Sequence, residues 1–362
     1  MADSNLCIKV GLIGCGEAAV RGHLPALRHV RGAEVIAAAD IDSHRLEQVA
    51  DRFGIPHRYT GHYELLDDPH VDAVGVCVPT DSHVQVASAV LDAGKHLLLE
   101  KPLALSLDAC DQLIERAKCS SCLTMMGFNM RWHRLAREAR DIVRQGKLGP
   151  IRMIRTLFAC HWESAGDLPE WRKRRELGGG ALVSESVHDF DLWRFLLDGE
   201  VEEVCAVTRQ DVVDDEVVAV VARMTDNVLA TSSIVERVSS EYAFEVLGLE
   251  GRLQASLFRF DGLSLIPASR RPGDPEVRLG SVANTLKELP RALLRPGGRN
   301  DYDASFVAQW QHFVDSIRQS TAPECTLLDG RRSLEIVLAA AQSASLGQLV
   351  SVAEAPATLP PA

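Results

Sequence analysis

Hydrophobic residues in the first third of the chain form short runs that alternate with stretches of helical periodicity. Each run is a candidate buried strand, and each amphipathic stretch a candidate helix. Helix 43–53 illustrates the pattern, with Ser43 as the expected cap and Leu46, Val49, Ala50 and Phe53 on one face. This alternation predicts a parallel, doubly wound sheet. Strands are predicted over 6–13, 34–39, 71–78, 96–99 and 123–126, and helices up to residue 28 and over 43–53, 81–93 and 106–119.

The rhythm changes near Gly127, where strands become frequent and are joined by short turns. Short turns favour antiparallel pairing. We therefore predict an α/β fold: an N-terminal Rossmann dinucleotide-binding domain (1–127), a C-terminal α+β domain with a large mixed or antiparallel open sheet (128–353), and a disordered tail (354–362). In the second domain, strands are expected over 151–158, 201–207, 217–224, 228–235, 243–247 and 253–257, helices over 133–145, 302–318 and 329–347, and a mobile Pro/Gly/Arg-rich loop over 270–300.

Composition narrows the classes of function. The net charge of −11 and the pI near 5.6 disfavour nucleic acid or an anionic membrane as the main partner. No apolar run approaches the roughly 20 residues that span a bilayer, and the polar amino terminus does not resemble a signal peptide. Nine cysteines cannot all pair within one chain, which favours a reduced, cytoplasmic protein. Cys119 and Cys122 have CxxC spacing but no second pair, so no metal site is predicted.

A glycine-rich turn follows the first predicted strand. Gly14, Cys15 and Gly16 begin a GxGxxA motif that continues through Glu17 and Ala18. In such a motif the first glycine makes the turn, the second admits a pyrophosphate, and the helix start supplies N–H groups to the phosphates. The sequence therefore predicts a dinucleotide site, against the alternative of an ordinary glycine turn.

An acidic residue ends the second predicted strand, 24 residues beyond Gly16. Asp40 is placed to accept hydrogen bonds from the ribose hydroxyls of NAD and to repel a 2′-phosphate. Ile41 follows it, and Arg45 lies one helical turn further on, where it is expected to stack on adenine or, as the alternative, to hold a phosphate. These residues favour NAD over NADP. Asp40 could also be an ordinary exposed strand end.

Two later strand ends carry polar residues at the same expected edge of the sheet. Pro79, Thr80 and His83 follow strand 71–78, and Glu100 and Lys101 follow strand 96–99. Open α/β sheets bind ligands at this edge. Lys101 is therefore the expected donor to a substrate oxygen on which negative charge develops. The alternative is a surface ion pair with Glu100.

Three glycines, Gly178 to Gly180, precede a predicted helix that carries Ser184, His188 and Asp191 at i, i+4 and i+7. That spacing places the three side chains on one helical face. His188 is the best candidate for a general base, because an imidazole titrates near neutral pH. A structural histidine is the alternative.

Together these motifs resemble the glucose–fructose oxidoreductase/inositol dehydrogenase (Gfo/Idh/MocA) family, over nearly the whole chain. The matching pieces are the glycine turn with His23-Leu24-Pro25-Ala26-Leu27, Ala39-Asp40 with Arg45, Pro79-Thr80 with His83, Glu100-Lys101-Pro102, Gly127-Phe128-Asn129 with Arg131, Trp171-Arg172, the triple glycine with His188, Tyr302 with Phe306, Trp310 and Phe313, and Asp329-Gly330-Arg331.

The resemblance implies an NAD(P)-dependent enzyme that oxidises or reduces a sugar, cyclitol or related polyol, with Lys101 and His188 at the reacting carbon. It also implies a homodimer or homotetramer. Asn129, Trp171 and Arg172 match positions that help to hold the cofactor. Arg131, Trp162, Ser184, Glu185 and Tyr302 are assigned to the substrate side.

One position departs from the family pattern. Many members carry an aspartate four residues before the histidine, where this chain has Ser184. On a continuous helix Glu185 lies about 100° away, so it need not replace that carboxylate.

The run Arg172-Lys173-Arg174-Arg175 could steer an acidic substrate or the pyrophosphate, or form a solvated loop. Two further functions stay open: an enzyme that retains NAD and cleaves glycosides, and a non-catalytic dinucleotide-binding regulator of the same fold.

Overall fold

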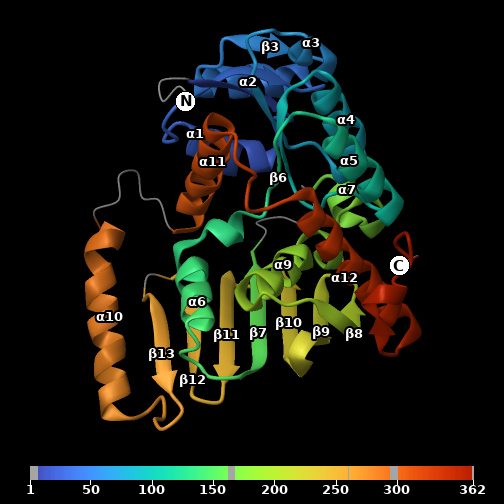
Figure 1. The fold of residues 1–362 in the computed structure, drawn as a ribbon. Helices are drawn as coiled ribbons and strands as arrows, with labels where there is room; N and C mark the ends of the chain where they lie inside the picture. Colours follow the sequence, from blue (N-terminus) through green and yellow to red (C-terminus); the bar gives the residue numbers. More distant parts are fainter. Residues whose placement is uncertain (1–6, 162–167, 260, 294–300, 361–362) are drawn as a thin grey trace. The chain divides into compact units, whose positions relative to one another are not determined.

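The computed structural model describes residues 7–161, 168–259, 261–293 and 301–360, without the side chains of residues 291 and 292. The chain divides into two units (Figure 1). Unit 1 contains the residues up to Asn129 together with Phe306–Leu334, and unit 2 contains Met130–Ser305 and the residues from Glu335 onward. Each unit is built on one sheet.

Unit 1 contains a six-stranded parallel sheet with the order β3-β2-β1-β4-β5-β6. This is the doubly wound arrangement that the sequence predicts, and the fold class is confirmed. The central strands β1, β4 and β5 are almost fully buried, as expected when both faces of a parallel sheet are covered. The strands are β1 Ile8–Ile13, β2 Ala33–Ala39, β3 His57–Tyr59, β4 Ala73–Val76, β5 His96–Leu99 and β6 Thr124–Met126.

Helices connect these strands. A π-helical turn, η1 (Ala19–His23), runs directly into α1. Helix α2 ends at Gly54, whose φ of 72° is the left-handed conformation that glycine adopts readily. The helical segments between these strands are α1 Leu24–Leu27, α2 Ser43–Phe53, α3 His62–Leu66, the 3-10 turn η2 Thr80–Ser82, α4 His83–Asp92 and α5 Leu107–Cys119.

Unit 2 contains an eight-stranded mixed sheet, with the order β13-β12-β11-β7-β10-β9-β8-β14. Only β7 and β10 pair in parallel; the other neighbours are antiparallel. Buried and more exposed residues alternate along β9 and β10, so one face of the sheet is buried and the other is more exposed. The strands are β7 Ile151–Cys160, β8 Val201–Arg209, β9 Val217–Met224, β10 Leu229–Glu236, β11 Glu241–Gly248, β12 Gly251–Ser256, β13 Leu263–Pro267 and β14 Val350–Ser351.

Helices of unit 2 cover the buried face of this sheet (Figure 1). Helix α9 contacts β7 and β10, and α6 packs against α9. The nearly continuous burial of α9 follows from this position between a sheet and a helix. Helix α8 (Ala181–Ser184) also contacts the sheet, at β9 and β10, whereas α10 (Pro275–Leu293) lies beside the edge strand β13. The remaining bounds are α6 Arg134–Arg144, α7 Glu170–Lys173 and α9 Ser186–Leu197; α11 Asp301–Gln319 and α12 Leu327–Leu346 each run from one unit into the other.

The predicted loop over 270–300 is wrong for most of its length, because residues 275–293 form helix α10. Pro275 stands first in the helix, where a missing N–H costs nothing. Leu279, Val282, Leu286, Leu289 and Leu293 recur at alternating spacings of three and four residues. This periodicity outweighs Gly280 and Pro290, on whose composition the loop was predicted. Residues 294–300 lie outside the described part.

Two smaller kinds of difference concern a helix cap and the shortest elements. Asp42, not Ser43, caps α2: its carboxylate accepts a hydrogen bond from the Arg45 N–H at 3.0 Å. The predicted pattern did not identify β3, α3 or β13, which have only three to five residues each. Elements this short carry too few residues to establish a period.

Candidate functional site

The glycine turn after β1 has the geometry that its motif predicts. Gly14 adopts φ +94°, and a Cβ there would meet the Cys77 carbonyl oxygen at 2.5 Å, so only glycine fits. A Cβ on Gly16 would meet nothing within 4 Å among the described residues. The backbone at Gly16 is thus open to a close approach from outside, and the helical turns that follow direct N–H groups toward the same end. A dinucleotide pyrophosphate fits this arrangement.

Asp40 ends β2 and is held on several sides. Its carboxylate accepts hydrogen bonds from the Cys15 N–H at 2.7 Å and the Asp42 N–H at 2.8 Å. Arg45 binds it in bidentate fashion at 2.7 and 3.1 Å. Burial opposes the charge of Asp40, but these hydrogen bonds together keep the pKa of the carboxyl below its ordinary value. Arg45 therefore lies on the carboxylate itself, closer than its spacing in the sequence implied.

The strand ends after β4 and β5 are joined through a buried histidine. The His83 ring contacts the Pro102 carbonyl oxygen at 2.7 Å and the Val78 carbonyl oxygen at 3.0 Å. Burial lowers the pKa of His83, so the neutral ring has one N–H for these two carbonyls. Thr80 is also buried, and it begins the short turn η2 that leads from the end of β4 into α4. His83 thus supports the sheet edge on which Lys101 lies.

Glu100, the first residue after β5, directs its side chain into unit 1. One carboxylate oxygen contacts His23 Nε2 at 2.8 Å, and the other accepts the Lys101 backbone N–H at 3.1 Å. A Cβ on Gly127 would lie 2.9 Å from the same carboxylate, so Gly127 provides the space for it. The Glu100 side chain is therefore an internal anchor for the backbone that carries Lys101, and Lys101 itself is half-buried.

In unit 2, the triple glycine packs tightly against other segments. A Cβ on Gly179 would lie 2.3 Å from the carbonyl oxygens of Trp171 and Arg172, and one on Gly180 would lie 2.7 Å from the Asp214 carbonyl oxygen. The Gly180 N–H donates to the Arg172 carbonyl at 3.0 Å. Close backbone contact explains why glycines occupy these positions. It also fixes the segment that precedes His188.

The predicted continuous helix through Ser184 and His188 is wrong. Glu185, with φ −110° and ψ −40°, separates α8 from α9. Ser184 Oγ donates to the Gly180 carbonyl at 2.8 Å and contacts the Glu185 carboxylate at 3.2 Å. The same carboxylate forms an ion pair with Arg172 at 2.7 Å. The prediction that Glu185 need not replace a carboxylate at position 184 assumed one continuous helix, and this break removes that assumption.

His188 lies in the first turn of α9 and is 8% exposed, with its backbone N–H bonded to the Glu185 carbonyl at 3.0 Å. The next residue, Asp189, is fully buried and accepts a hydrogen bond from Ser232 Oγ at 2.5 Å. Burial raises the pKa of Asp189 to about 6, although the hydroxyls of Ser232, Thr156 and Tyr242 oppose the shift. A carboxyl that titrates near neutrality thus follows His188 in the chain.

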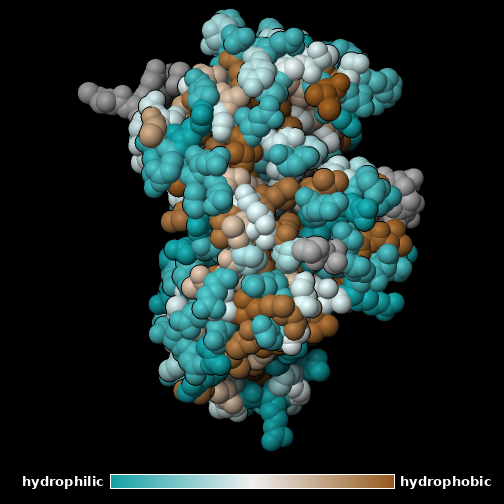
Figure 2. All heavy atoms as spheres, turned by 90° about the vertical axis from the view of Figure 1, so that its right-hand side faces the viewer, coloured by the Kyte–Doolittle hydropathy of each residue, from teal (hydrophilic) through white to brown (hydrophobic). Residues whose placement is uncertain are grey.

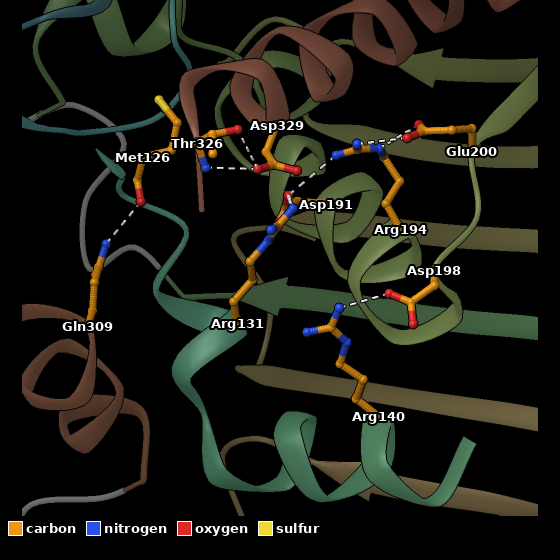
Figure 3. Close-up of polar contacts among 10 residues, drawn as sticks. All are labelled: Met126, Arg131, Arg140, Asp191, Arg194, Asp198, Glu200, Gln309, Thr326 and Asp329. Atoms are coloured by element: carbon orange, nitrogen blue, oxygen red, sulfur yellow. Dashed lines mark hydrogen bonds and ion pairs between the residues drawn. The ribbon is translucent and has the colours of Figure 1, made fainter. Parts of the chain in front are cut away.

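Arg131 and Asp191, both buried, form a bidentate ion pair with distances of 2.5 and 2.7 Å (Figure 3). Asp191 also lies 3.9 Å from Arg194, which pairs in turn with Glu200. The Arg131 guanidinium lies over the Phe195 ring at 5.6 Å. The side chain predicted to contact substrate is thus engaged inside unit 2. Asp191, which the sequence placed on the same helical face as His188, directs its carboxylate to Arg131.

The remaining candidates have less specific surroundings. Glu17 pairs with exposed Arg21, and Ile41 is 91% exposed beside Asp40. Asn129 is buried at the end of unit 1. The ring of Tyr302 packs edge-on against Phe258, with centroids 5.7 Å apart. Ala18 lies in the first helical turn after the glycines, Trp171 is half-buried in α7, and Trp162 lies outside the described residues.

Two domain models of one protein family match the chain. Residues 8–128 match the model described as "Oxidoreductase family, NAD-binding Rossmann fold" (GFO_IDH_MocA), and residues 136–254 match the GFO/IDH/MocA C-terminal domain. The chain belongs to the Gfo/Idh/MocA family. The resemblance inferred from the motifs is confirmed, and this protein is an oxidoreductase with an NAD-binding Rossmann unit.

Curated relatives of this Gfo/Idh/MocA protein act on polyols and sugars by name. A myo-inositol 2-dehydrogenase of Thermotoga maritima is 28% identical over 346 residues, which cover 93% of this chain and 96% of that protein. A 1,5-anhydro-D-fructose reductase of Ensifer adhaerens is 29% identical over 352 residues, with 94% and 98% coverage. Both oxidation and reduction therefore occur among the relatives of this chain.

Solved structures support the fold. An oxidoreductase domain protein from Kribbella flavida matches with a TM-score of 0.82 at 23% identity, covering 96% of this chain and 99% of that one. A scyllo-inositol dehydrogenase from Lactobacillus casei, solved with NAD(H) and scyllo-inositol, matches with a TM-score of 0.77 at 21% identity, with 96% and 99% coverage.

Further observations concern the surface, the helices, the metal-ligating side chains and the cysteines of the Gfo/Idh/MocA chain. On the face drawn in Figure 2, hydrophilic residues predominate and hydrophobic ones gather in separate patches. None of the helices in the described ranges has both the length and the apolar character needed to cross a membrane. Within the same ranges, no cluster of His, Cys, Asp and Glu side chains could hold a metal ion. No disulfide joins any of the nine cysteines, all of which lie in the described ranges.

Proposed function

We propose that this oxidoreductase transfers a hydride between the nicotinamide ring of NAD and a carbinol or carbonyl carbon of a sugar, cyclitol or related polyol. The observation that carries the proposal is the position of Lys101. It is the second residue after β5, and β5 is separated from β1 only by β4, so Lys101 shares the carboxyl edge of one parallel sheet with the glycine turn. Ligands of open α/β sheets bind at this edge.

In the oxidative direction, a carbinol C–H bond breaks as hydride leaves the carbon, and the carbon becomes a carbonyl. NAD supplies the hydride acceptor when it is bound. Lys101 donates a hydrogen bond to the substrate oxygen and stabilises the negative charge that develops on it. His188 accepts the hydroxyl proton, and it returns that proton when the reaction runs as a reduction. Ser184 and Glu185, which contact each other, border the segment that carries His188.

The cofactor is proposed to be NAD rather than NADP. Asp40 keeps its negative charge where a ribose 2′-hydroxyl would bind, which disfavours a 2′-phosphate. Arg45 is already paired with Asp40, and this pairing makes the arginine a poorer phosphate ligand. Residues 1–127 are proposed to bind the cofactor, and residues 128–353 to bind the substrate.

A neutral substrate is favoured over an acidic one. Each cation in the run 172–175 has a carboxylate partner, so the run is not a bare positive patch. The pairs are Arg172–Glu185 at 2.7 Å, Lys173–Glu170 at 3.8 Å, Arg174–Glu170 at 3.6 Å and Arg175–Asp215 at 3.2 Å. Hydroxyl-rich sugars and cyclitols fit these surroundings better than uronic acids.

A homodimer or homotetramer is proposed from the exposed face of the unit 2 sheet. Leu157, Val207, Val221 and Leu229 lie on the face opposite α9 and are 39–69% exposed. Apolar side chains gathered on one open face are typical of a surface that another protein covers. Sedimentation of wild type and Val221→Glu checks this, since a monomeric wild type would contradict it.

The enzymatic proposal is tested by following NADH absorbance with a panel of inositols, hexoses and uronic acids, with NADP in parallel. Net, substrate-dependent reduction of NAD is the expected result. Product formation without net NADH would instead favour an enzyme that retains NAD, and NAD binding without any turnover would favour the dinucleotide-binding regulator. Either outcome contradicts the dehydrogenase proposal.

A further inference from the structure

A chain of buried polar groups leads from helix α11 to the residue before Lys101. Trp310 and His23 are fully buried, and Glu100 is 8% exposed. Trp310 Nε1 lies 2.9 Å from His23 Nδ1, and His23 Nε2 lies 2.8 Å from the Glu100 carboxylate. The other oxygen of that carboxylate accepts the Lys101 N–H at 3.1 Å. All four residues belong to unit 1.

The Trp310 N–H determines which atoms donate and which accept along this series of hydrogen bonds. An indole N–H can only donate, so His23 Nδ1 must accept. The proton of a neutral imidazole then resides on Nε2 and points at Glu100. Burial lowers the pKa of His23, but its contacts with Cys77 and Glu100 raise it further, to about 10, which favours a second ring proton. The geometry at Nδ1 opposes that proton, because it would meet the Trp310 N–H head-on, so the neutral Nε2–H tautomer is the one that fits the contacts with both Trp310 and Glu100.

Packing holds the donor and the imidazole in place. The His23 ring meets Phe306 and Trp310 edge-on, with centroids 5.3 and 5.8 Å apart. A Cβ on Gly22 would lie 2.7 Å from the Phe306 ring, so α11 sits close against the turn before α1. The imidazole has little freedom to rotate, and its hydrogen bonds therefore have fixed directions.

We propose that Trp310 and His23 are positioning residues for Lys101. Trp310 selects the His23 tautomer, His23 orients the Glu100 carboxylate, and Glu100 fixes the backbone from which the Lys101 side chain extends. None of the three needs to touch the substrate. The inference rests on the proposed catalytic role of Lys101, and it adds residues that lie outside the glycine turn and the strand ends.

The most specific variant is Trp310→Phe, which keeps an aromatic ring but removes the N–H donor. We expect kcat to fall about five- to tenfold, the effect of losing one hydrogen bond, with the KM for NAD little changed. Gln309→Met is the matched control. Gln309 precedes Trp310 on α11 and is equally buried. It donates to the Met126 carbonyl at 3.4 Å (Figure 3), a contact that is not part of the hydrogen-bonded series from Trp310 to Lys101. Its kcat should stay at the wild-type level.

Two further variants separate positioning from packing. His23→Gln keeps one donor and one acceptor and should retain more activity than His23→Leu, which has neither. Because the groups act in series, Trp310→Phe combined with Glu100→Gln should lose no more activity than Glu100→Gln alone. Equal kcat for His23→Gln and His23→Leu, or full additivity in the double variant, would overturn the inference.

Two measurements do not depend on turnover, so they separate this inference from the proposed function. The ¹⁵N chemical shifts of the His23 ring should report the Nε2–H tautomer at neutral pH. The rate at which an amine-acylating reagent modifies Lys101, read by mass spectrometry of its peptide, should rise in Trp310→Phe and stay unchanged in Gln309→Met. A doubly protonated His23, or an unchanged Lys101 rate in Trp310→Phe, would overturn the inference even if the wild type is an active dehydrogenase.

Discussion

The two candidate catalytic residues are held in place in different ways. Lys101 follows a short buried strand, and its backbone is anchored by the side chain just before it. His188 lies in the first turn of a helix whose start is set by a break at Glu185 and by glycines packed against Trp171, Arg172 and Asp214. The position of a strand end follows from local sequence signals and the order of strands in the sheet. The position of a helix start of this kind depends on contacts with other segments of the chain. This difference determines which parts of the site are predictable from sequence.

The largest expected effect is on the two reacting groups themselves. Lys101→Met and His188→Asn should each lower kcat by about 10²–10⁴-fold, the range for a lost proton-transfer or charge-stabilising group. NAD affinity, measured by fluorescence quenching, should change little. Lys118→Met removes an exposed lysine from α5 of the same unit and should leave kcat unaltered. Wild-type kcat in either active-site variant would remove that residue from the mechanism.

The next effect separates a structural from a substrate role for Arg131. Arg131→Met leaves the Asp191 carboxylate buried without its bidentate partner, and the free energy of unfolding should fall by about 3–5 kcal/mol. Arg131→Met combined with Asp191→Leu should recover most of that loss, as chemical denaturation would reveal. A variant of normal stability with a raised KM for the polyol would instead assign Arg131 to the substrate.

Asp189 should make the stability of unit 2 depend on pH. Its folded pKa of about 6 lies above the ordinary 3.8, so the folded state holds the proton more tightly than the unfolded state. Stability should therefore be highest below pH 4 for this group and fall as pH rises to about 6, by about 3 kcal/mol at most. The difference in unfolding free energy between wild type and Asp189→Asn isolates this group, and a difference independent of pH would contradict the assignment.

The smallest effect concerns cofactor choice at the other end of the site. Asp40→Ser removes the carboxylate and releases Arg45, so the ratio of kcat/KM for NADP to that for NAD should rise about 10- to 100-fold. Asp42→Ser is the control, because serine also caps a helix and Asp42 does not end the strand. An unchanged ratio in Asp40→Ser would place the ribose elsewhere.

Much of unit 1 was predictable because its signals are local. Strand 96–99, helix 43–53 and the need for glycine at position 14 follow from residues within a few positions of each feature. The buried partners of Glu100 were not predictable in this way. His23 stood out only within a family motif, and Trp310 lies 287 residues further along the chain.

In unit 2 the sequence identified the residues but not their surroundings. The periodicity of 181–197 is that of one helix, yet tertiary contacts split it at Glu185 and bring that carboxylate to Ser184 and Arg172. The sequence around Arg131 is typical of a ligand-binding cation, because its partner Asp191 lies 60 residues further along the chain. Helix α10 was missed because glycine and proline outweighed a regular apolar period.

The most direct test of the account is isotope transfer. The panel polyol with the fastest turnover, deuterated at the carbinol carbon, is incubated with the enzyme and NAD, and the cofactor is analysed by mass spectrometry. The account predicts one deuterium on the reduced nicotinamide for each ketone formed, and loss of this transfer in Lys101→Met and His188→Asn. Product that forms while the cofactor stays unlabelled would contradict direct hydride transfer.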